Sequence, residues 1–181
     1  MSRLPLIQPD TATGRAAELL GDVQQALGVT PNMTKAMANS PAVLAGYLGL
    51  SGALGGGALD AATRERIALL VAQENGCDYC LSAHSYIGAN IAELAADDIS
   101  DSRRGASSNP KTQAVLTFAA AVVRSRGEVT EVELKAARAA GLTDGEIVEV
   151  VAGVALNVFT NYLNKVVDTD IDWPIVRAHT H

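Results

Sequence analysis

Two cysteines and a histidine lie in one short stretch of this chain, at Cys77, Cys80 and His84. Cys77 and Cys80 are its only cysteines, and His84 is its only histidine outside the last three residues. Side chains three and four positions apart are neighbours on a helix, so the three are predicted to share one helical face. Two thiols beside an imidazole can carry out redox chemistry or bind a metal ion.

The order of these residues indicates how one thiol could be activated. The thiolate is the nucleophile, whereas a free cysteine with a pKa of ~8.5 is mostly protonated at neutral pH. The first turn of a helix favours negative charge, and His84 can accept the proton of Cys80. Cys77 can then condense with an oxidised Cys80 to form a disulfide. The spacing therefore predicts a two-step thiol cycle.

A carboxylate earlier in the chain is predicted to reach the histidine. The pair Asn75-Gly76 interrupts the helical pattern, so the helices on either side should form an antiparallel hairpin. At 1.5 Å per residue, Glu65 lies about 15 Å from the turn on one helix and His84 about 12 Å from it on the other. We therefore expect a carboxylate–imidazole–thiol chain of Glu65, His84 and Cys80, in which the carboxylate orients the ring.

Breakers and capping residues predict helices along the rest of the chain, and hence an all-α fold. Two capping boxes, Thr130-x-x-Glu133 and Thr143-x-x-Glu146, are expected to start the last two helices. The polar stretch 97–109 is expected to be the longest irregular connection. The predicted helices number about eight: 12–27, 31–39, 41–53, 61–74, 77–90, 110–126, 131–140 and 144–167.

Composition supports packed helices and argues against several classes of partner. Hydrophobic residues make up 48% of the chain but aromatic residues only 4%, so the core must consist of small aliphatic side chains. A net charge of −6 and the lack of a Lys/Arg cluster argue against nucleic acid binding. No segment approaches the roughly 18 apolar residues of a membrane span, so we expect a cytoplasmic protein. In that compartment a Cys-x-x-Cys pair is more often catalytic or metal-binding than a static disulfide.

The pattern Glu-x11-Cys-x-x-Cys-x-x-x-His resembles the alkylhydroperoxidase D group of the carboxymuconolactone decarboxylase superfamily. The resemblance covers residues 59–174 and is weaker over 1–55. It is carried by the segment Leu59–Ile87, by Asn157–Asn161 and by the ending Asp172-Trp173-Pro174. We therefore expect one compact multi-helix domain over 1–181, with a motif-bearing core at 59–174 and an N-terminal helical extension at 1–55.

The resemblance implies hydroperoxide reduction by an all-helical protein that assembles into trimers or hexamers. By that similarity Cys80 is the peroxidatic cysteine, Cys77 the resolving cysteine, and His84 with Glu65 the proton relay. Some members carry a histidine directly before the second cysteine, where this chain has Tyr79. The decarboxylase branch lacks the cysteine pair, which disfavours lactone decarboxylation here.

Each of these residues also has a simpler interpretation. The cysteines could be small core residues, or half of a metal site to which Glu65 adds a ligand. Glu65 itself could lie on a solvated face between two arginines, making exposed ion pairs of little energetic value. Tyr79 and Tyr86 could line a pocket or simply pack. A row of asparagines on one helical face could bind a ligand, but interhelical hydrogen bonds or a subunit contact are the expected role: Asn157, Asn161 and Asn164. His179 and His181 are assigned no role.

The residues together predict a thiol-dependent peroxidase that cycles between the Cys77/Cys80 dithiol and its disulfide. No haem, flavin or metal is required, because sulfur carries the two electrons. The expected partners are a hydroperoxide substrate, a dithiol electron donor of lipoyl or thioredoxin type, and further copies of the chain. The alternatives are a disulfide reductase that relays electrons to another peroxidase and a non-enzymatic redox-sensing or metal-binding module.

Overall fold

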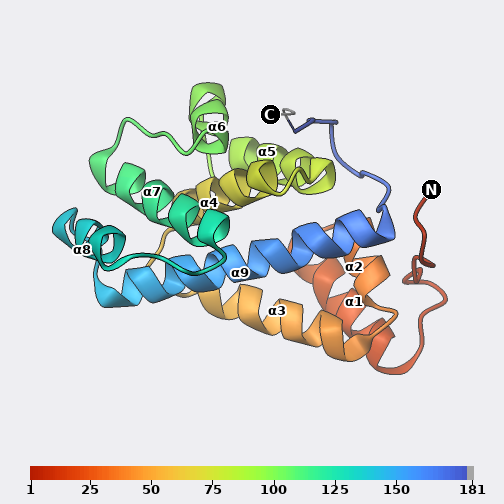
Figure 1. Cartoon of the computed structure of the whole chain (residues 1–181). Helices are drawn as coiled ribbons and strands as arrows, with labels where there is room; N and C mark the ends of the chain where they lie inside the picture. The colour runs from red at the N-terminus through yellow and green to blue at the C-terminus, as the bar shows by residue number, and fades with distance from the viewer. Residues whose placement is uncertain (179–181) are drawn as a thin grey trace.

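Nine α-helices make up the regular structure of residues 1–178, which are the residues that the computed structural model describes (Figure 1). This part of the chain contains no strand, and the predicted all-α fold is confirmed. His179 and His181 lie outside the described residues. The helices are α1 (Gly14–Leu27), α2 (Asn32–Met37), α3 (Pro41–Gly55), α4 (Ala61–Glu74), α5 (Asp78–Asn90), α6 (Ala96–Arg103), α7 (Pro110–Ser125), α8 (Glu131–Ala139) and α9 (Asp144–Val167).

Helices α4, α8 and α9 start at the capping residues that the sequence predicts. The Thr130 and Thr143 side chains each accept a hydrogen bond from the backbone N–H three residues on, and both capping boxes are complete. Asp60 caps α4 by accepting from the Thr63 N–H at 2.7 Å. Between α4 and α5 the chain reverses at Gly76, whose φ of 60° lies in the left-handed region that favours glycine.

Helix α6 covers the first half of the stretch 97–109, which was expected to be irregular. Its sequence is polar and lacks the apolar spacing of a typical amphipathic helix, which is why that expectation was wrong. Contacts with α4 hold it: Arg66 donates to the Ser102 hydroxyl at 3.2 Å and pairs with Asp98 at 2.9 Å. Ile99 packs against the buried cluster around α5. Tertiary contacts, rather than the local pattern, therefore stabilise this helix.

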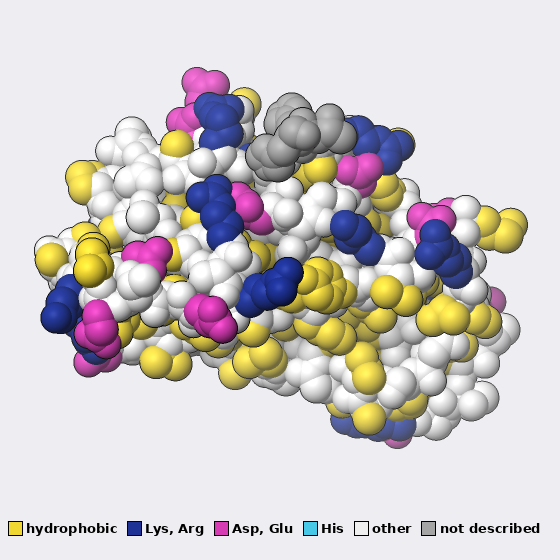
Figure 2. Space-filling view, in the orientation of Figure 1, with side chains coloured by type: hydrophobic (Ala, Val, Ile, Leu, Met, Phe, Trp, Pro, Cys, Tyr) yellow, Lys and Arg dark blue, Asp and Glu magenta, His cyan; other side chains and the backbone are white. Residues whose placement is uncertain are grey.

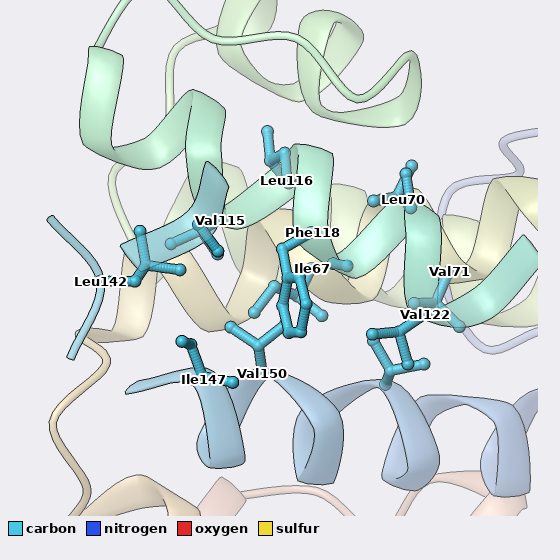
Figure 3. Close-up of a cluster of buried hydrophobic side chains, with 14 of the residues drawn as sticks. Ile67, Leu70, Val71, Val115, Leu116, Phe118, Val122, Leu142, Ile147 and Val150 are labelled. Carbon is cyan, nitrogen blue, oxygen red and sulfur yellow. The ribbon is translucent and has the colours of Figure 1, made fainter. Parts of the chain in front are cut away.

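Helix α4 lies at the centre of the packing and contacts α5, α6, α7 and α9. The largest buried cluster fills the space between α4, α7 and α9, where Ile67, Phe118 and Val150 meet (Figure 3). A second cluster surrounds the cysteines and includes the C-terminal segment 171–178. A third joins α1, α2 and α3. The helix that carries Glu65 is thus fixed from several sides.

Helix α9 is the one described helix that is long and apolar enough to cross a membrane by length and composition, which the sequence analysis did not anticipate. It contacts α3, α4, α5 and α7, and polar side chains are buried along it, as in the core helix of a helical bundle. Apolar side chains also gather along the face of the molecule on which α9 lies (Figure 2). The exposed apolar side chains of α9 are Val148, Val151, Phe159, Tyr162 and Val166.

Candidate active site

The two cysteines occupy the first turn of α5, directly after the turn at Gly76. Cys77 is the N-cap of the helix, and its sulfur accepts a hydrogen bond from the backbone N–H of Cys80 at 3.4 Å. Both are free thiols, and each is only 2% exposed. The side chains are within hydrogen-bonding range of each other. The helix start thus places a second thiol beside Cys80 with little access from solvent.

The hairpin of α4 and α5 brings Glu65 and His84 together. The Glu65 Oε2 lies 2.8 Å from the His84 Nδ1, and the two side chains are 17% and 22% exposed. Glu65 therefore does not lie on a solvated face. Burial opposes a charge on the ring, but the Glu65 carboxylate outweighs it, so the pKa of His84 lies above its usual value. With Nδ1 bonded to the carboxylate, Nε2 is the ring nitrogen left for proton transfer.

The two sulfurs differ in their environments. Hydrogen bonds from the Cys77 thiol and from Asn164, with Asn161 and Thr160 nearby, outweigh burial and lower the pKa of Cys80. The Asn164 Nδ2 donates to the Cys80 Sγ at 3.3 Å. The pKa of Cys77 is raised, because it gives its hydrogen bond to Cys80 and is itself buried. This asymmetry favours a thiolate on Cys80 and a neutral thiol on Cys77.

The asparagine row of α9, for which the sequence favours hydrogen bonds between helices or a subunit contact, reaches the cysteine site. Asn157 bonds within its own helix, to the Gly153 carbonyl, and not to another helix. Asn161 accepts from the Asn75 amide of the turn at 2.9 Å, while its own Nδ2 has no partner among the described residues. Asn164 reaches Cys80. The signal that could have been used is the spacing of amides along one face of an otherwise apolar helix.

Tyr79 directly precedes Cys80, but its hydroxyl bonds to groups other than the thiols. Its hydroxyl donates to the Asp172 Oδ2 at 2.7 Å and accepts from the Met33 N–H at 3.2 Å. Burial, and then the hydrogen bond with Asp172, raise the pKa of this phenol. Tyr79 therefore links α5 to α2 and to the C-terminal segment, and its hydroxyl is not available to the thiols.

The C-terminal segment packs over the start of α5. The Asp78 carboxylate pairs with Arg177 at 2.6 Å and accepts from the Ala178 N–H at 2.8 Å. Ser82 exchanges hydrogen bonds with the Val176 backbone. The segment also packs against the buried cluster that contains both cysteines.

A cavity of about 960 Å³ reaches Cys80. Its walls include Cys80, His84 and Glu65, whereas Cys77 does not line it. Most of the remaining lining is apolar and comes from α1, α3, α5 and α9. A tilted pair of rings, Tyr86 and Trp173, lies in the wall with centroids 5.2 Å apart. Only one of the two sulfurs is therefore open to a molecule in the cavity.

No group of three or more His, Cys, Asp or Glu side chains among residues 1–178 is arranged to hold a metal ion. Cys77 and Cys80 form a sulfur pair, and Glu65 and His84 form a carboxylate–imidazole pair. All of these except Cys77 line the cavity.

Part of the chain matches a known protein family, and solved structures share its fold. Residues 41–108 match the model of the carboxymuconolactone decarboxylase family, so the match begins before the region 59–174 and includes α3. No curated protein matches significantly. A structure from Ralstonia eutropha JMP134, an alkylhydroperoxidase AhpD core and uncharacterized peroxidase-related protein, is 26% identical with a TM-score of 0.83, over 94% of this chain and 92% of that one.

Two further structures share the fold. An uncharacterized peroxidase-related protein from Silicibacter sp. TM1040 is 24% identical, with a TM-score of 0.82 over 93% of this chain and 91% of that one. The debrominase Bmp8 is 20% identical, with a TM-score of 0.75 over 94% of this chain and 91% of that one. These likenesses extend over the N-terminal helices as well as the motif. Over residues 41–108 the chain thus matches the carboxymuconolactone decarboxylase family, and as a whole it has an alkylhydroperoxidase D-like fold.

Proposed function

We propose that this protein reduces organic hydroperoxides through a dithiol–disulfide cycle of Cys80 and Cys77. The observation that carries the proposal is the difference between the sulfurs. Cys80 has a lowered pKa and lines the cavity, whereas Cys77 has a raised pKa and is shut off from it. A nucleophile open to substrate, with a protonated thiol behind it, is the arrangement that a two-step peroxidase needs.

In the first step, the Cys80 thiolate attacks the outer oxygen of the hydroperoxide. The S–O bond forms, the O–O bond breaks, and an alcohol leaves with the proton that Cys80 had given to His84. The sulfur is oxidised to sulfenic acid, and the hydroperoxide is reduced by two electrons. Glu65 holds the ring and stabilises its charged form during the transfer.

In the second step, the Cys77 sulfur attacks the sulfenic sulfur. A disulfide forms, and the oxygen leaves as water with the Cys77 proton. Because Cys77 already lies within hydrogen-bonding range of Cys80, this step needs little movement of the chain. An external dithiol, of lipoyl or thioredoxin type, then reduces the disulfide and restores both thiols.

Two cysteine variants test this division of roles. Wild-type protein should lose both thiols on mild oxidation by tert-butyl hydroperoxide and release the alcohol. Cys77→Ser should consume one equivalent and accumulate a trappable sulfenic acid, while Cys80→Ser should be inert. If Cys77→Ser is inert and Cys80→Ser reacts, the peroxidatic role belongs to Cys77; if wild type keeps both thiols, the protein is not a thiol peroxidase.

A second candidate, reductive debromination, is favoured by one comparison. A structure of debrominase Bmp8, a cysteine-to-alanine variant in complex with 2,3,4-tribromopyrrole, shares the fold at 20% identity. The same dithiol could deliver two electrons to a carbon–bromine bond, releasing bromide, adding a proton to carbon and forming the disulfide. A cavity of about 960 Å³ with a mostly apolar wall has room for an aromatic ring. Bromide release from tribromopyrrole, compared with alcohol release from the hydroperoxide, separates the two activities.

A further inference from the structure

A tyrosine from outside the motif faces the same cavity as the reactive sulfur. Tyr47 lies on α3 and lines the cavity together with Cys80, His84 and Glu65. The charges of Cys80 and Glu65 both act on its hydroxyl, which places the phenol in the electrostatic field of the site. Its position 33 residues before Cys80 in the sequence explains why the motif does not reveal it.

The Tyr47 hydroxyl keeps its proton and can act as a hydrogen-bond donor. Ser51 lies one helical turn further along α3, and its interaction with the phenol lowers the pKa of Tyr47. Burial, followed by the charges of Cys80 and Glu65, outweighs this effect and raises the pKa of Tyr47 to about 12. The hydroxyl therefore stays protonated at any pH at which the thiol works. Because Tyr47 lines the cavity and keeps its proton, its O–H can donate to a molecule there.

The proposed reaction needs such a donor. As the thiolate attacks, negative charge builds on the inner oxygen of the hydroperoxide until the O–O bond breaks. Tyr79 cannot supply the hydrogen bond, because its hydroxyl donates to Asp172. Two other polar groups of the wall make hydrogen bonds within the protein: Asn157 donates to the Gly153 carbonyl, and the Arg64 Nη1 donates to the Leu59 carbonyl.

We propose that the Tyr47 hydroxyl is a catalytic hydrogen-bond donor to the leaving oxygen of the hydroperoxide. This inference rests on the proposed peroxidase function. Tyr47 stabilises the developing alkoxide without losing its own proton, and the proton that completes the alcohol is the one that Cys80 passed to His84. The S–O bond, the broken O–O bond and the two electrons are those of the first step above.

The competing interpretation is that Tyr47 only packs. Its ring contacts the buried cluster of α1, α2 and α3. Tyr47→Phe keeps the ring and removes only the hydroxyl, so it separates the two roles. Tyr162→Phe is the matched control, because Tyr162 is an exposed residue of α9 that does not line the cavity.

The test measures two reactions of the same sulfur by stopped flow. Removing one donor from an oxyanion site typically costs about 10²–10³-fold, and a neutral phenol should fall at or below the lower end. Tyr47→Phe should therefore react with tert-butyl hydroperoxide about 10–100-fold more slowly than wild type. Alkylation by iodoacetamide should be unchanged, because it reports thiolate formation and its leaving iodide needs no such donor. A peracid, whose carboxylate leaves readily, should show a smaller loss than the alkyl hydroperoxide.

The outcomes distinguish failure of the Tyr47 role from failure of the proposed function. Equal hydroperoxide rates for wild type and Tyr47→Phe would overturn the role of Tyr47 and leave the peroxidase proposal standing. A parallel loss in the iodoacetamide reaction would also overturn it, because the hydroxyl would then act on the thiol. If wild type itself fails to react with hydroperoxide or peracid while iodoacetamide alkylates it, the proposed function is wrong and Tyr47 has no leaving oxygen to serve.

Discussion

Asn164→Leu is expected to raise the pKa of Cys80 while leaving the fold intact. Leucine is close to asparagine in shape, so the substitution mainly removes the amide that donates to the Cys80 Sγ at 3.3 Å. The thiolate loses a donor, whereas the neutral thiol loses little. The carbonyl oxygen of Asn164 is buried without a hydrogen-bond partner among the described residues, so its removal takes away an unsatisfied group.

The size of the effect follows from the energy of one charged hydrogen bond. Such bonds contribute about 1.5–3 kcal/mol, and one pKa unit corresponds to about 1.36 kcal/mol. The pKa of Cys80 should therefore rise by about one to two units. The rate with hydroperoxide near neutral pH should fall by up to about 100-fold, and it should recover above the new pKa, where the thiol ionises without the amide.

The assay is a pH titration of the thiolate by its ultraviolet absorbance in a Cys77→Ser background, so that one sulfur is observed. The pH dependence of iodoacetamide alkylation provides an independent value. Asn157→Leu is the matched control on the same helix, because its amide donates to the Gly153 carbonyl and not to sulfur. That variant should leave the pKa of Cys80 at its wild-type value.

An unchanged pKa of Cys80 in a folded Asn164→Leu protein would refute the reasoning. The amide would then not stabilise the thiolate, whatever its distance from the sulfur. A large drop in melting temperature together with an unchanged pKa would show that Asn164 acts through packing alone.

Three further predictions follow from the same structure. Glu65→Gln should keep the fold yet slow hydroperoxide attack at neutral pH by about 10²-fold, with recovery at high pH; a wild-type rate throughout would remove the carboxylate from the relay. Asp60→Ala should lower the free energy of unfolding by about 1 kcal/mol near neutral pH, measured by urea denaturation. Because capping lowers the pKa of Asp60 from 3.8, this difference should disappear as the pH falls below that value through the folded-state pKa; a difference that persists in strong acid would contradict it. Light scattering should give a mass of several subunits, since apolar side chains are exposed along α9; a monomer would contradict this.

The local parts of the fold could be predicted because their causes lie within a few residues of one another. The capping boxes at Thr130 and Thr143, the N-cap at Asp60 and the turn at Gly76 all depend on short-range hydrogen bonds and backbone preference. Helix α6 could not be predicted this way, because Arg66 of α4 holds it through Ser102 and Asp98.

The sequence by itself determined which groups could react and which helices carry them. Helix geometry alone places the two cysteines and the histidine on one helical face. It also places a glutamate at a matching distance on the helix before the hairpin turn. Only the tertiary structure decided which sulfur is stabilised and what faces it. Asn164 lies 84 residues after Cys80 and Tyr47 lies 33 residues before it, and each is brought to the site by packing of a separate helix. The spacing to His84 already favoured Cys80, but a thiol pKa also depends on burial and on donors within a few ångströms, and those contacts come from the tertiary structure.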